Sequence, residues 1–462
     1  MSSRLLIITH EKMGQKMAGP AIRTQEIAKA LSRQGITVTV SFPFPFHEEI
    51  QGINFESFHW EDPSSIENLI NCHEVLFATG PVLARILQVI GHSINIPVVV
   101  DLYDVVEIEK ILVDVYSERK QVDPLAAYLS EMFLYLRQGD FFVCGSERQI
   151  DFWLGCLLAV GRINHQNLPI LDSISSIICV VPMGIPMIDP SHQEKRIKGV
   201  IDGISETDKI VFWSGGIWDW SDPLSLLEAF EIVLSSRSDV KLVFGSLHHY
   251  DTSIVPKTSM AERFLHYIKE KSWIGKKVHF LDWVPYEIRS DFLLESDLGV
   301  SLFLNPLESR YAVRSRLMDH LWTGLPTIST YGDEISDLLA SLGLARLVEI
   351  RDVNAIAEAM LNYLEKPFER EKWLKNNRDV INKYRWDNTV EPIINFLKNP
   401  GKAQDKPAIQ HSLNYVIPLR REWERLIHDR ELLQEEVIML RQRKVVRIAD
   451  FYGKIRNKIL GK

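Results

Sequence analysis

LLIITHEKMGQKMAGPAIRTQEIAKALSRQGITVTVSF, residues 5–42, is the stretch that decides the fold. An apolar run at 5–9 leads into a polar loop, the loop leads into an amphipathic segment at 20–34, and a second apolar run follows at 36–42. Short runs rich in Val and Ile that flank a helix-length segment ending at Gly35 are typical of a strand, a helix and a second strand. The stretch therefore predicts a β-α-β unit in a buried parallel sheet.

The same alternation continues on both sides of a polar stretch at 189–208. We expect two consecutive doubly wound α/β domains with Rossmann-like sheets, at 1–190 and 191–385. The chain beyond residue 366 contains helical patterns alone, with a closing helix at 386–398 and a linker and helical tail at 399–462. The predicted strands lie at 5–9, 36–42, 74–79, 96–103, 141–146 and 177–184, and then at 209–215, 240–246, 277–284, 297–304, 326–332 and 345–350.

Two segments of the tail, at 426–440 and 441–462, each allow two interpretations. Leu426, Leu433 and Leu440 are seven residues apart, which suits a short coiled coil or an amphipathic surface helix. Residues 441–462 carry eight basic side chains against one acidic side chain, with apolar residues at helical spacing. A basic amphipathic helix suits an anionic membrane surface, and a solvated charged tail is the alternative.

Bulk composition excludes several classes. The 462 residues have a net charge of −8, which gives no nucleic-acid signature. The four cysteines are scattered, without the spacing of a zinc site or a disulfide frame, so we expect thiols in a reducing, cytoplasmic compartment. The N-terminus does not read as a signal peptide, and no stretch reaches the roughly 18 uncharged apolar residues of a membrane span.

Ligands of open α/β sheets bind beyond the carboxyl ends of the strands, so the loops there are the candidate sites. The loop after the first strand contains His10, Gly14 and Gly19 before a helix N-terminus, which offers backbone N–H groups to an anion. It matches neither GxGxxG nor a P-loop, and a plain strand-to-helix turn is the alternative. Asp104 follows a later strand, where it could orient a hydroxyl or accept its proton, or cap the next helix.

The first loop of the second domain reads SGGIWDWSDP, residues 214–223. Gly215 and Gly216 allow a ligand to approach the backbone, and the segment Trp218-Asp219-Trp220 offers rings that could stack on a base or sugar. Burial of the tryptophans in the core is the alternative. Asp222-Pro223 should begin a helix.

RSRLMDHLWTGLP, residues 314–326, is the richest stretch. Arg314 and Arg316 oppose the dipole of the helix that they begin, so a bound anion explains them better than helix stability does. Glu308 and Asp319 could hold the hydroxyls of a ribose or sugar. A set of salt bridges among these residues is the alternative.

These segments together resemble the retaining GT-B glycosyltransferases of glycosyltransferase family 4, which include sucrose synthase and bacterial mannosyl- and glucosyltransferases. The resemblance spans about residues 3–398. It is carried by DLYD (101–104), SERQIDFWLG (146–155), GGIWDW (215–220), RSRLMDHLWTGLP (314–326) and Gly332-Asp333.

The resemblance implies roles for the candidate residues. Gly19 would border the cleft and Asp104 would lie in the catalytic pocket. Residues 215–220, with Arg314 and Arg316, would face the donor pyrophosphate. Asp319 would take the place of the second glutamate of the family's E-x7-E signature, which holds the ribose.

The sequence departs from the family's pattern at two places in the donor site. The place of the first glutamate of the signature holds Tyr311, and Glu308 either replaces that glutamate or does not. The loop at 215–220 also lacks the lysine that would neutralise phosphate in relatives.

The implied function is retaining transfer of a sugar from a nucleotide sugar to a glycan or lipid-linked acceptor, without metal or cofactor, in cell-surface polysaccharide synthesis. The expected place is the cytoplasm or the cytoplasmic face of a membrane, without a nucleic-acid partner. Two alternatives are a sugar-nucleotide epimerase of the same fold and a catalytically silent scaffold that binds a partner or membrane through its tail.

Overall fold

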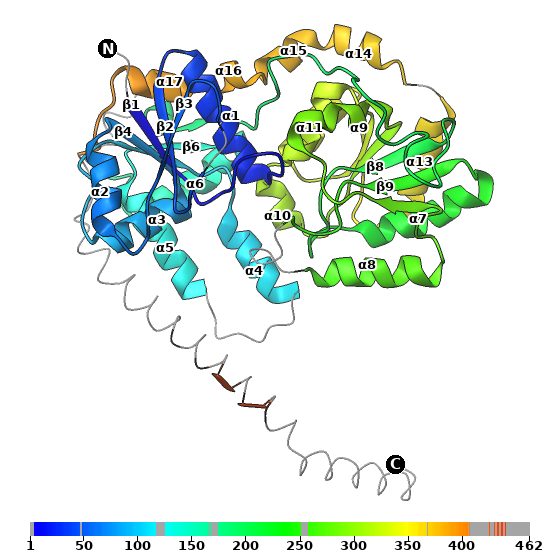
Figure 1. Cartoon of the computed structure of the whole chain (residues 1–462), viewed down its shortest axis with the longest axis horizontal. Coiled ribbons are helices and arrows are strands. Elements are labelled where there is room, and N and C mark those ends of the chain that lie inside the picture. The colour runs from blue at the N-terminus through cyan, green and yellow to red at the C-terminus, as the bar shows by residue number, and fades with distance from the viewer. Residues whose placement is uncertain are drawn as a thin grey trace, which may run out of the picture.

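The computed structural model contains two all-parallel sheets, one in each half of the chain (Figure 1). The seven-stranded sheet has the order β3-β2-β1-β4-β5-β6-β7 and the six-stranded sheet the order β10-β9-β8-β11-β12-β13. The chain order of strands reverses beside β1 in the first sheet and beside β8 in the second, so each domain has a switch point there. The structure describes residues 4–46, 49–116, 125–165, 168, 174–250, 257–366, 368–404 and 406, and single residues between 425 and 439.

The first domain alternates strands and helices from its start, as the sequence predicts. Its elements are β1 (Arg4–Ile8), α1 (Gly19–Arg33), β2 (Thr37–Phe42), β3 (Ile53–Ser57), α2 (Pro63–Asn71), β4 (Val75–Thr79), α3 (Gly80–Ile90), β5 (Val98–Asp101), α4 (Val106–Tyr116), α5 (Leu125–Gln138), β6 (Phe141–Cys144), α6 (Glu147–Ala159), η2 (Ile174–Ser176) and β7 (Ile178–Val180).

The second domain repeats this arrangement and ends in a series of short helices. Its elements are β8 (Lys209–Trp213), α7 (Pro223–Ser236), β9 (Val240–Phe244), α8 (Ser259–Glu270), β10 (Val278–Phe280), η3 (Tyr286–Ile288), α9 (Arg289–Glu295), β11 (Leu298–Ser301), α10 (Pro306–Tyr311), α11 (Ser315–Thr323), β12 (Thr327–Thr330), α12 (Glu334–Ser341), β13 (Ala345–Val348), α13 (Val353–Glu365), α14 (Arg370–Asn376), α15 (Arg378–Lys383), α16 (Trp386–Thr389) and α17 (Glu391–Lys398).

The predicted fold class is confirmed. Each predicted run after the first contains a strand that is shorter than the run, and β1 has the length of its run but begins one residue earlier. The sequence analysis missed β3, the edge strand of the first sheet. Only its first residue, Ile53, is buried, so β3 lacks the apolar run that identified the other strands. Asp222 caps α7 by accepting from the N–H of Ser225, and Pro223 is the first residue of that helix, as predicted.

One hydrophobic core joins the two domains. It contains Met13 and Met17 from the loop after β1 together with Leu317 and Met318 from α11. Trp386 at the start of α16 is fully buried in the same core. The domains are therefore packed through apolar contacts as well as through polar ones, which fixes the loops at the switch points against each other.

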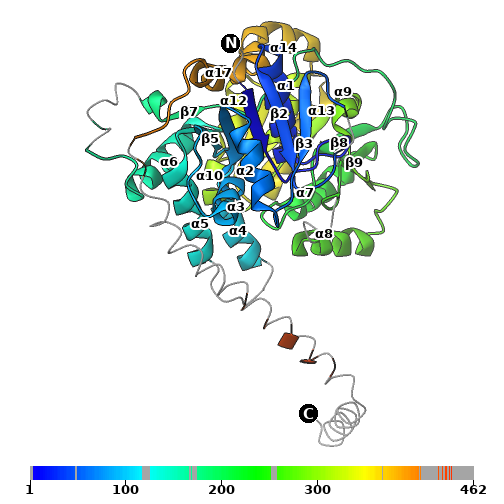
Figure 2. The same cartoon turned by 60° about the vertical axis from the view of Figure 1, so that its left-hand side comes forward.

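The final helices run from the second domain back to the first, along one side of both domains (Figure 1), and α14 and α17 lie on that same side in the turned view (Figure 2). The segment predicted as one closing helix forms two, α16 and α17, and α16 contacts α1. Asp387 accepts from both Nε and Nη2 of Arg33 at 2.9 and 2.5 Å, which ties the returning segment to the first domain. The predicted basic segment at 441–462, Leu426 and Leu440 lie outside the described residues.

Among the described helices, none has the length and apolar composition needed to cross a membrane. The predicted membrane contact of the tail is untested by this finding, because the segment concerned is not described.

Candidate functional site between the two sheets

The loops at the carboxyl ends of the two sheets meet between the domains. The N–H of Tyr286 donates to the carbonyl of Gln15 at 3.3 Å. Lys16 Nζ lies 2.6 Å from Asp282 Oδ2. Farther along the boundary, the side-chain amide of Gln149 donates to the carbonyls of both Tyr103 and Tyr311 at 2.6 Å. These contacts place the loops after β1 and β5 against those after β10 and β11. The region between them, together with the loop after β8, is the interdomain site.

The N-termini of α1 and α11 face each other in this site. A Cβ on Gly19, the first residue of α1, would lie 3.4 Å from Oγ of Ser315, the first residue of α11, and 3.8 Å from the hydroxyl of Tyr103. Neither helix receives a hydrogen bond from a capping side chain at its N-terminus. Two N-terminal dipole ends, with their backbone N–H groups, therefore converge on one place, which favours negative charge. Gly19 allows this close approach.

Arg316 adds a positive charge to the same region. Its Cγ lies 3.8 Å from the place that a Cβ on Gly215 would take. Burial lowers the pKa of Arg316; Asp319 opposes that shift and Arg289 adds to it. Within the part of the chain that the structure describes, no carboxylate is within ion-pair distance of this guanidinium. Since an arginine stays charged in proteins, Arg316 is the strongest candidate for binding an anion in the site.

Arg314 is differently placed from its neighbour. Its two terminal nitrogens donate to the two carboxylate oxygens of Glu308 at 2.6 and 2.5 Å. The guanidinium carbon also lies 3.3 Å from the ring centroid of Phe303. Both side chains of the pair are buried. The sequence analysis gave Arg314 and Glu308 separate roles in binding a donor. In the structure they form an ion pair with each other, which is the salt-bridge alternative named there.

Asp319 is likewise paired, with a residue that the sequence analysis missed. Arg289 Nε donates to its Oδ1 at 2.7 Å. The guanidinium of Arg289 stacks on the rings of Tyr286 and Trp322, at 3.7 and 4.8 Å. Burial alone would lower the pKa of Arg289, but attraction to Asp319 raises it overall. A ribose-binding role of Asp319 therefore depends on the oxygen that Arg289 does not occupy.

In the loop at 215–220, some residues lie at the interdomain site and others hold the loop in place. Asp219 accepts from Ser259 Oγ and from the N–H of Met260, both at 2.9 Å, so it stabilises the first turn of α8. Trp220 is buried and stacks on half-buried Trp218, with ring centroids 5.6 Å apart. The two glycines bring the backbone next to Arg316 and His248. Gly215 and Gly216 thus lie at the site, and Asp219 and Trp220 support the loop.

Asp104 lies in a buried acidic cluster that spans both domains. Burial raises its pKa to about 6, and Tyr103, which donates a hydrogen bond to it, and Arg23 pull the pKa down. Burial also raises the pKa of Glu109 well above its usual range, with Asp104 and Glu308 adding to the shift. Asp104, Glu109, Glu308 and Tyr311 line one small cavity. A carboxyl with a pKa near neutrality can exchange a proton with a hydroxyl group.

Of the three residues predicted in the loop that follows β1, only Gly19 lies at the convergent helix ends. His10 is exposed and pairs with Glu11, with Nε2 and Oε1 at 3.1 Å. Gly14 has a φ of 130°, a conformation that favours glycine. Buried Met13 and Met17 hold the loop in the interdomain core, and Lys16 reaches the second domain. Among the contacts between described residues, none places His10 or Gly14 at the convergent helix ends.

An aromatic group at the carboxyl ends of β9 and β10 also escaped the sequence analysis. Tyr250 lies against His249 and Trp283, with ring centroids at 4.3 and 5.1 Å. Trp283 is next to Asp282, the partner of Lys16. The signal that could have revealed this group is the position of its members: His249 and Tyr250 follow the predicted strand at 240–246, and Trp283 lies near the end of the predicted run at 277–284. The rings offer stacking surfaces beside the anion-binding region.

Metal ligands were not expected. Among the residues with described positions, no group of three or more His, Cys, Asp or Glu side chains is arranged to hold a metal ion. Burial favours the protonated forms of Asp104 and Glu109, and the guanidinium of Arg314 pairs with the third carboxyl group of the cluster, that of Glu308.

Comparison with solved structures identifies the architecture. Sucrose-phosphate synthase from Thermosynechococcus elongatus superposes with a TM-score of 0.57 at 12% identity, over 86% of this chain and 98% of the other. WaaG, a glycosyltransferase involved in lipopolysaccharide biosynthesis, gives 0.57 at 14% identity, over 86% and 100%. HepE from Anabaena, solved with UDP and glucose, gives 0.59 at 12% identity, over 86% and 100%. No protein-family model and no curated protein matches the sequence. The chain has the GT-B fold.

Proposed function

We propose that this protein is a glycosyltransferase that transfers a sugar from a nucleotide-sugar donor across the interdomain site. The observation that carries the proposal is the convergence of Arg316 with the N-termini of α1 and α11 beside Gly215. Charge develops on a diphosphate leaving group as its bond to the sugar breaks. Positioned guanidinium and N–H groups in a water-poor site stabilise such charge more than any other single effect.

The aromatic group of His249, Tyr250 and Trp283 suits the donor base. It lies at the carboxyl ends of two strands of the second sheet, as expected for a ligand of an open α/β domain. Stacking on a planar base needs no particular hydrogen-bond pattern, so the group favours a nucleotide without selecting one. HepE, of the same fold, was solved with UDP, and a uridine nucleotide is the first donor class to test.

The acceptor side of the proposal rests on Asp104. Its carboxyl, with a pKa raised to about 6, lies in the first domain beside Glu308 and Tyr311 of α10. It would orient an acceptor hydroxyl and take part of its proton as the new bond forms. We propose retention at the anomeric carbon, in line with the resemblance to retaining enzymes, with a glycan or lipid-linked acceptor and a location at the cytoplasmic face of a membrane.

Nucleotide binding tests the donor site directly. Thermal unfolding is followed with UDP-, GDP-, ADP- and TDP-sugars for the native chain, Arg316→Ala and the control Arg263→Ala, whose side chain is exposed on α8. A ligand that binds the folded state alone stabilises it by about 2.7 kcal/mol at a concentration of 100 Kd. We expect sugars of one nucleotide class to raise the melting temperature of the native and control chains. Arg316→Ala should need at least a tenfold higher ligand concentration for the same rise.

Two outcomes would contradict the proposal. A native chain that responds to no nucleotide sugar would favour the silent-scaffold alternative, which the internal neutralisation of Arg314 by Glu308 and of Asp319 by Arg289 also favours. Free nucleotide without a glycosylated acceptor would favour an epimerase. The anomeric configuration of a product, read by NMR coupling constants, decides between retention and inversion.

A further inference from the structure

The segment that leaves α17 crosses the N-terminal edge of the first sheet. Lys402 Nζ donates to the carbonyls of Ile94 and Asn95, ahead of β5, at 3.2 and 3.3 Å. The N–H of Ala403 then donates to Asp140 Oδ1, directly ahead of β6, at 2.7 Å. Lys406 Nζ lies 2.9 Å from both oxygens of the same carboxylate. We name residues 399–404 with Lys406 the strap.

The strap ends beside the C-terminal end of α5. Lys406 Nζ also donates to the carbonyl of Gln138, the last residue of α5, at 3.1 Å. Arg162 Nη1 donates to the carbonyls of Leu136 and Gly139 at the same helix end, at 2.9 and 2.7 Å. A chain that continues beyond Lys406 on this side of the sheet would lead toward Ile163, which follows Arg162, and toward the turn at residues 174–177 that precedes β7.

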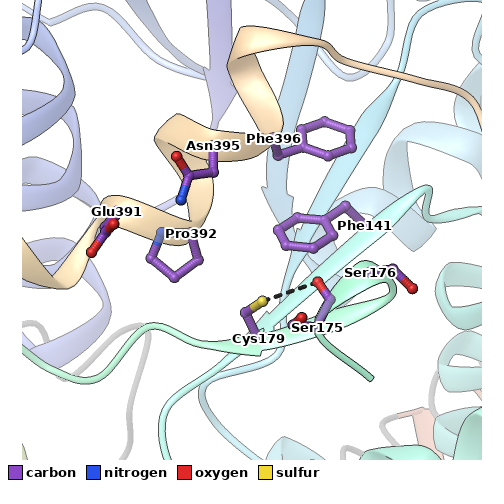
Figure 3. Close-up of a pocket in the computed structure, with 8 residues that line it drawn as sticks. All are labelled: Phe141, Ser175, Ser176, Cys179, Glu391, Pro392, Asn395 and Phe396. Carbon is purple, nitrogen blue, oxygen red and sulfur yellow. Dashed lines mark hydrogen bonds between the residues drawn. The ribbon is translucent and has the colours of Figure 1, made fainter. Parts of the chain in front are cut away.

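Two hollows flank this turn, one on each face of the sheet. The hollow beneath α17 has a volume of about 380 Å³ and a mixed lining that includes Ser175, Glu391 and Asn395 (Figure 3). In it the thiol of Cys179 donates to the carbonyl of Ser175, and Phe141 stacks on Phe396. These polar and already paired groups do not favour an apolar occupant.

The hollow on the other face, beside α6, is apolar throughout. Its volume is about 410 Å³. Leu158 and Ile174 on its walls remain 61% and 52% exposed, which is unusual for adjacent large aliphatic side chains. We name this hollow the α6 groove; besides Gly155, it is lined by Leu154, Leu158, Ile163, Leu168, Ile174 and Ile177.

We propose that the α6 groove is the docking site for residues 407–419 of the same chain. This segment, PAIQHSLNYVIPL, begins directly after Lys406 and is free of Asp, Glu, Lys and Arg. Ile409, Leu413 and Val416 recur at helical spacing, which gives it one apolar face. Its thirteen residues would span about 20 Å as a helix, enough to reach the groove from the strap.

Docking there attaches the start of the tail to the first domain. The basic segment at 441–462 would then act from the domain that carries Asp104, and the strap would separate it from the second domain. Any membrane or partner bound by the tail would orient the first domain with its side of the interdomain site.

Hydrogen exchange of the full chain, read by mass spectrometry, tests the docking. We expect the amides of residues 408–417 to exchange at least tenfold more slowly than in a synthetic peptide of the same sequence. The double variant Leu158→Asp with Ile174→Asp should restore the rate of the peptide. Ile232→Asp, at an exposed aliphatic position on α7, is the matched control and should keep the protection.

A second double variant, in the tail, controls for the case in which the groove variant misfolds. Ile409→Asp with Leu413→Asp changes only the tail, and should speed exchange at residues 154–158 and 174–177. The proposal is overturned if 408–417 exchange at the rate of the peptide in the native chain, or if protection survives both double variants. Protection that grows with protein concentration would indicate a second copy, and a response confined to residues 169–173 would indicate the connecting segment; either result overturns it.

Discussion

Replacing Arg314 by methionine should destabilise the second domain far more than an ordinary surface substitution. The guanidinium makes two hydrogen bonds to Glu308 at 2.6 and 2.5 Å, and the two side chains are 9% and 2% exposed. Its loss leaves a buried carboxylate beside Glu109 and Asp104, without a counter-charge. Breaking a buried ion pair in this way costs about 3–5 kcal/mol.

Scanning calorimetry measures the effect in a two-domain protein without assuming a single transition. A loss of 1 kcal/mol lowers the melting temperature of a domain of this size by roughly 2–4 °C, so Arg314→Met should lower one transition by roughly 6–20 °C. Adding Glu308→Gln removes the orphaned charge and should recover at least half of that loss. Arg263→Met, exposed on α8, is the control and should remain within about 0.5 kcal/mol.

The reasoning would be refuted by a shift of Arg314→Met no larger than that of Arg263→Met. It would be refuted equally if Glu308→Gln gave no recovery, because the cost would then come from lost packing on Phe303. A large response of Arg316→Met in the absence of nucleotide would contradict the distinction drawn between the two arginines.

Three further predictions concern the acidic cluster, the cleft and the tail. The pKa of Asp104 is about 6 in the folded chain and near 3.8 in the unfolded chain, so its contribution to the free energy of unfolding is greatest below pH 3.8 and is lost as the pH rises through 6. Asp104→Asn should therefore make the urea midpoint depend less on pH over that range. An unchanged dependence would show that Asp104 does not cause it. Gly19→Leu should collide with Ser315, 3.4 Å from the place of its Cβ, and abolish the nucleotide-dependent thermal shift; a normal shift would place the ligand elsewhere. Deleting residues 441–462 should remove salt-sensitive pelleting with anionic liposomes, and undiminished pelleting would discard membrane contact by this segment.

Much of the fold could be predicted because its signals are local. A buried parallel strand must be apolar on both faces, and a helix that covers it repeats every 3.6 residues, so β1, α1 and β2 are readable in residues 5–42. Asp222-Pro223 and Gly324 mark the ends of helices through their own backbone preferences. The edge strand β3 was missed because solvent, and not a second layer, covers most of its residues.

The candidate site was predicted less completely because the tertiary structure decides which of its charged side chains form ion pairs. Arg314 and Arg316 are two residues apart, yet Arg314 is paired with Glu308 and Arg316 lies beside Gly215. Asp319 pairs with Arg289, thirty positions earlier in the chain. No spacing rule reveals these choices, since a side chain's direction depends on the turn that precedes it and on the elements packed around it.

The sequence by itself determined the two parallel sheets, their order along the chain and the loops in which ligands can bind, because these follow from hydrophobic periodicity and from the preferences of Gly, Pro and Asp. Only the tertiary structure decided which groups meet: the two helix N-termini at Gly19 and Ser315, the rings of Tyr250 and Trp283, and the shared burial of Asp104 and Glu109. Burial and ion pairing are properties of neighbours that are distant in the chain. They appear only when the two domains are packed together.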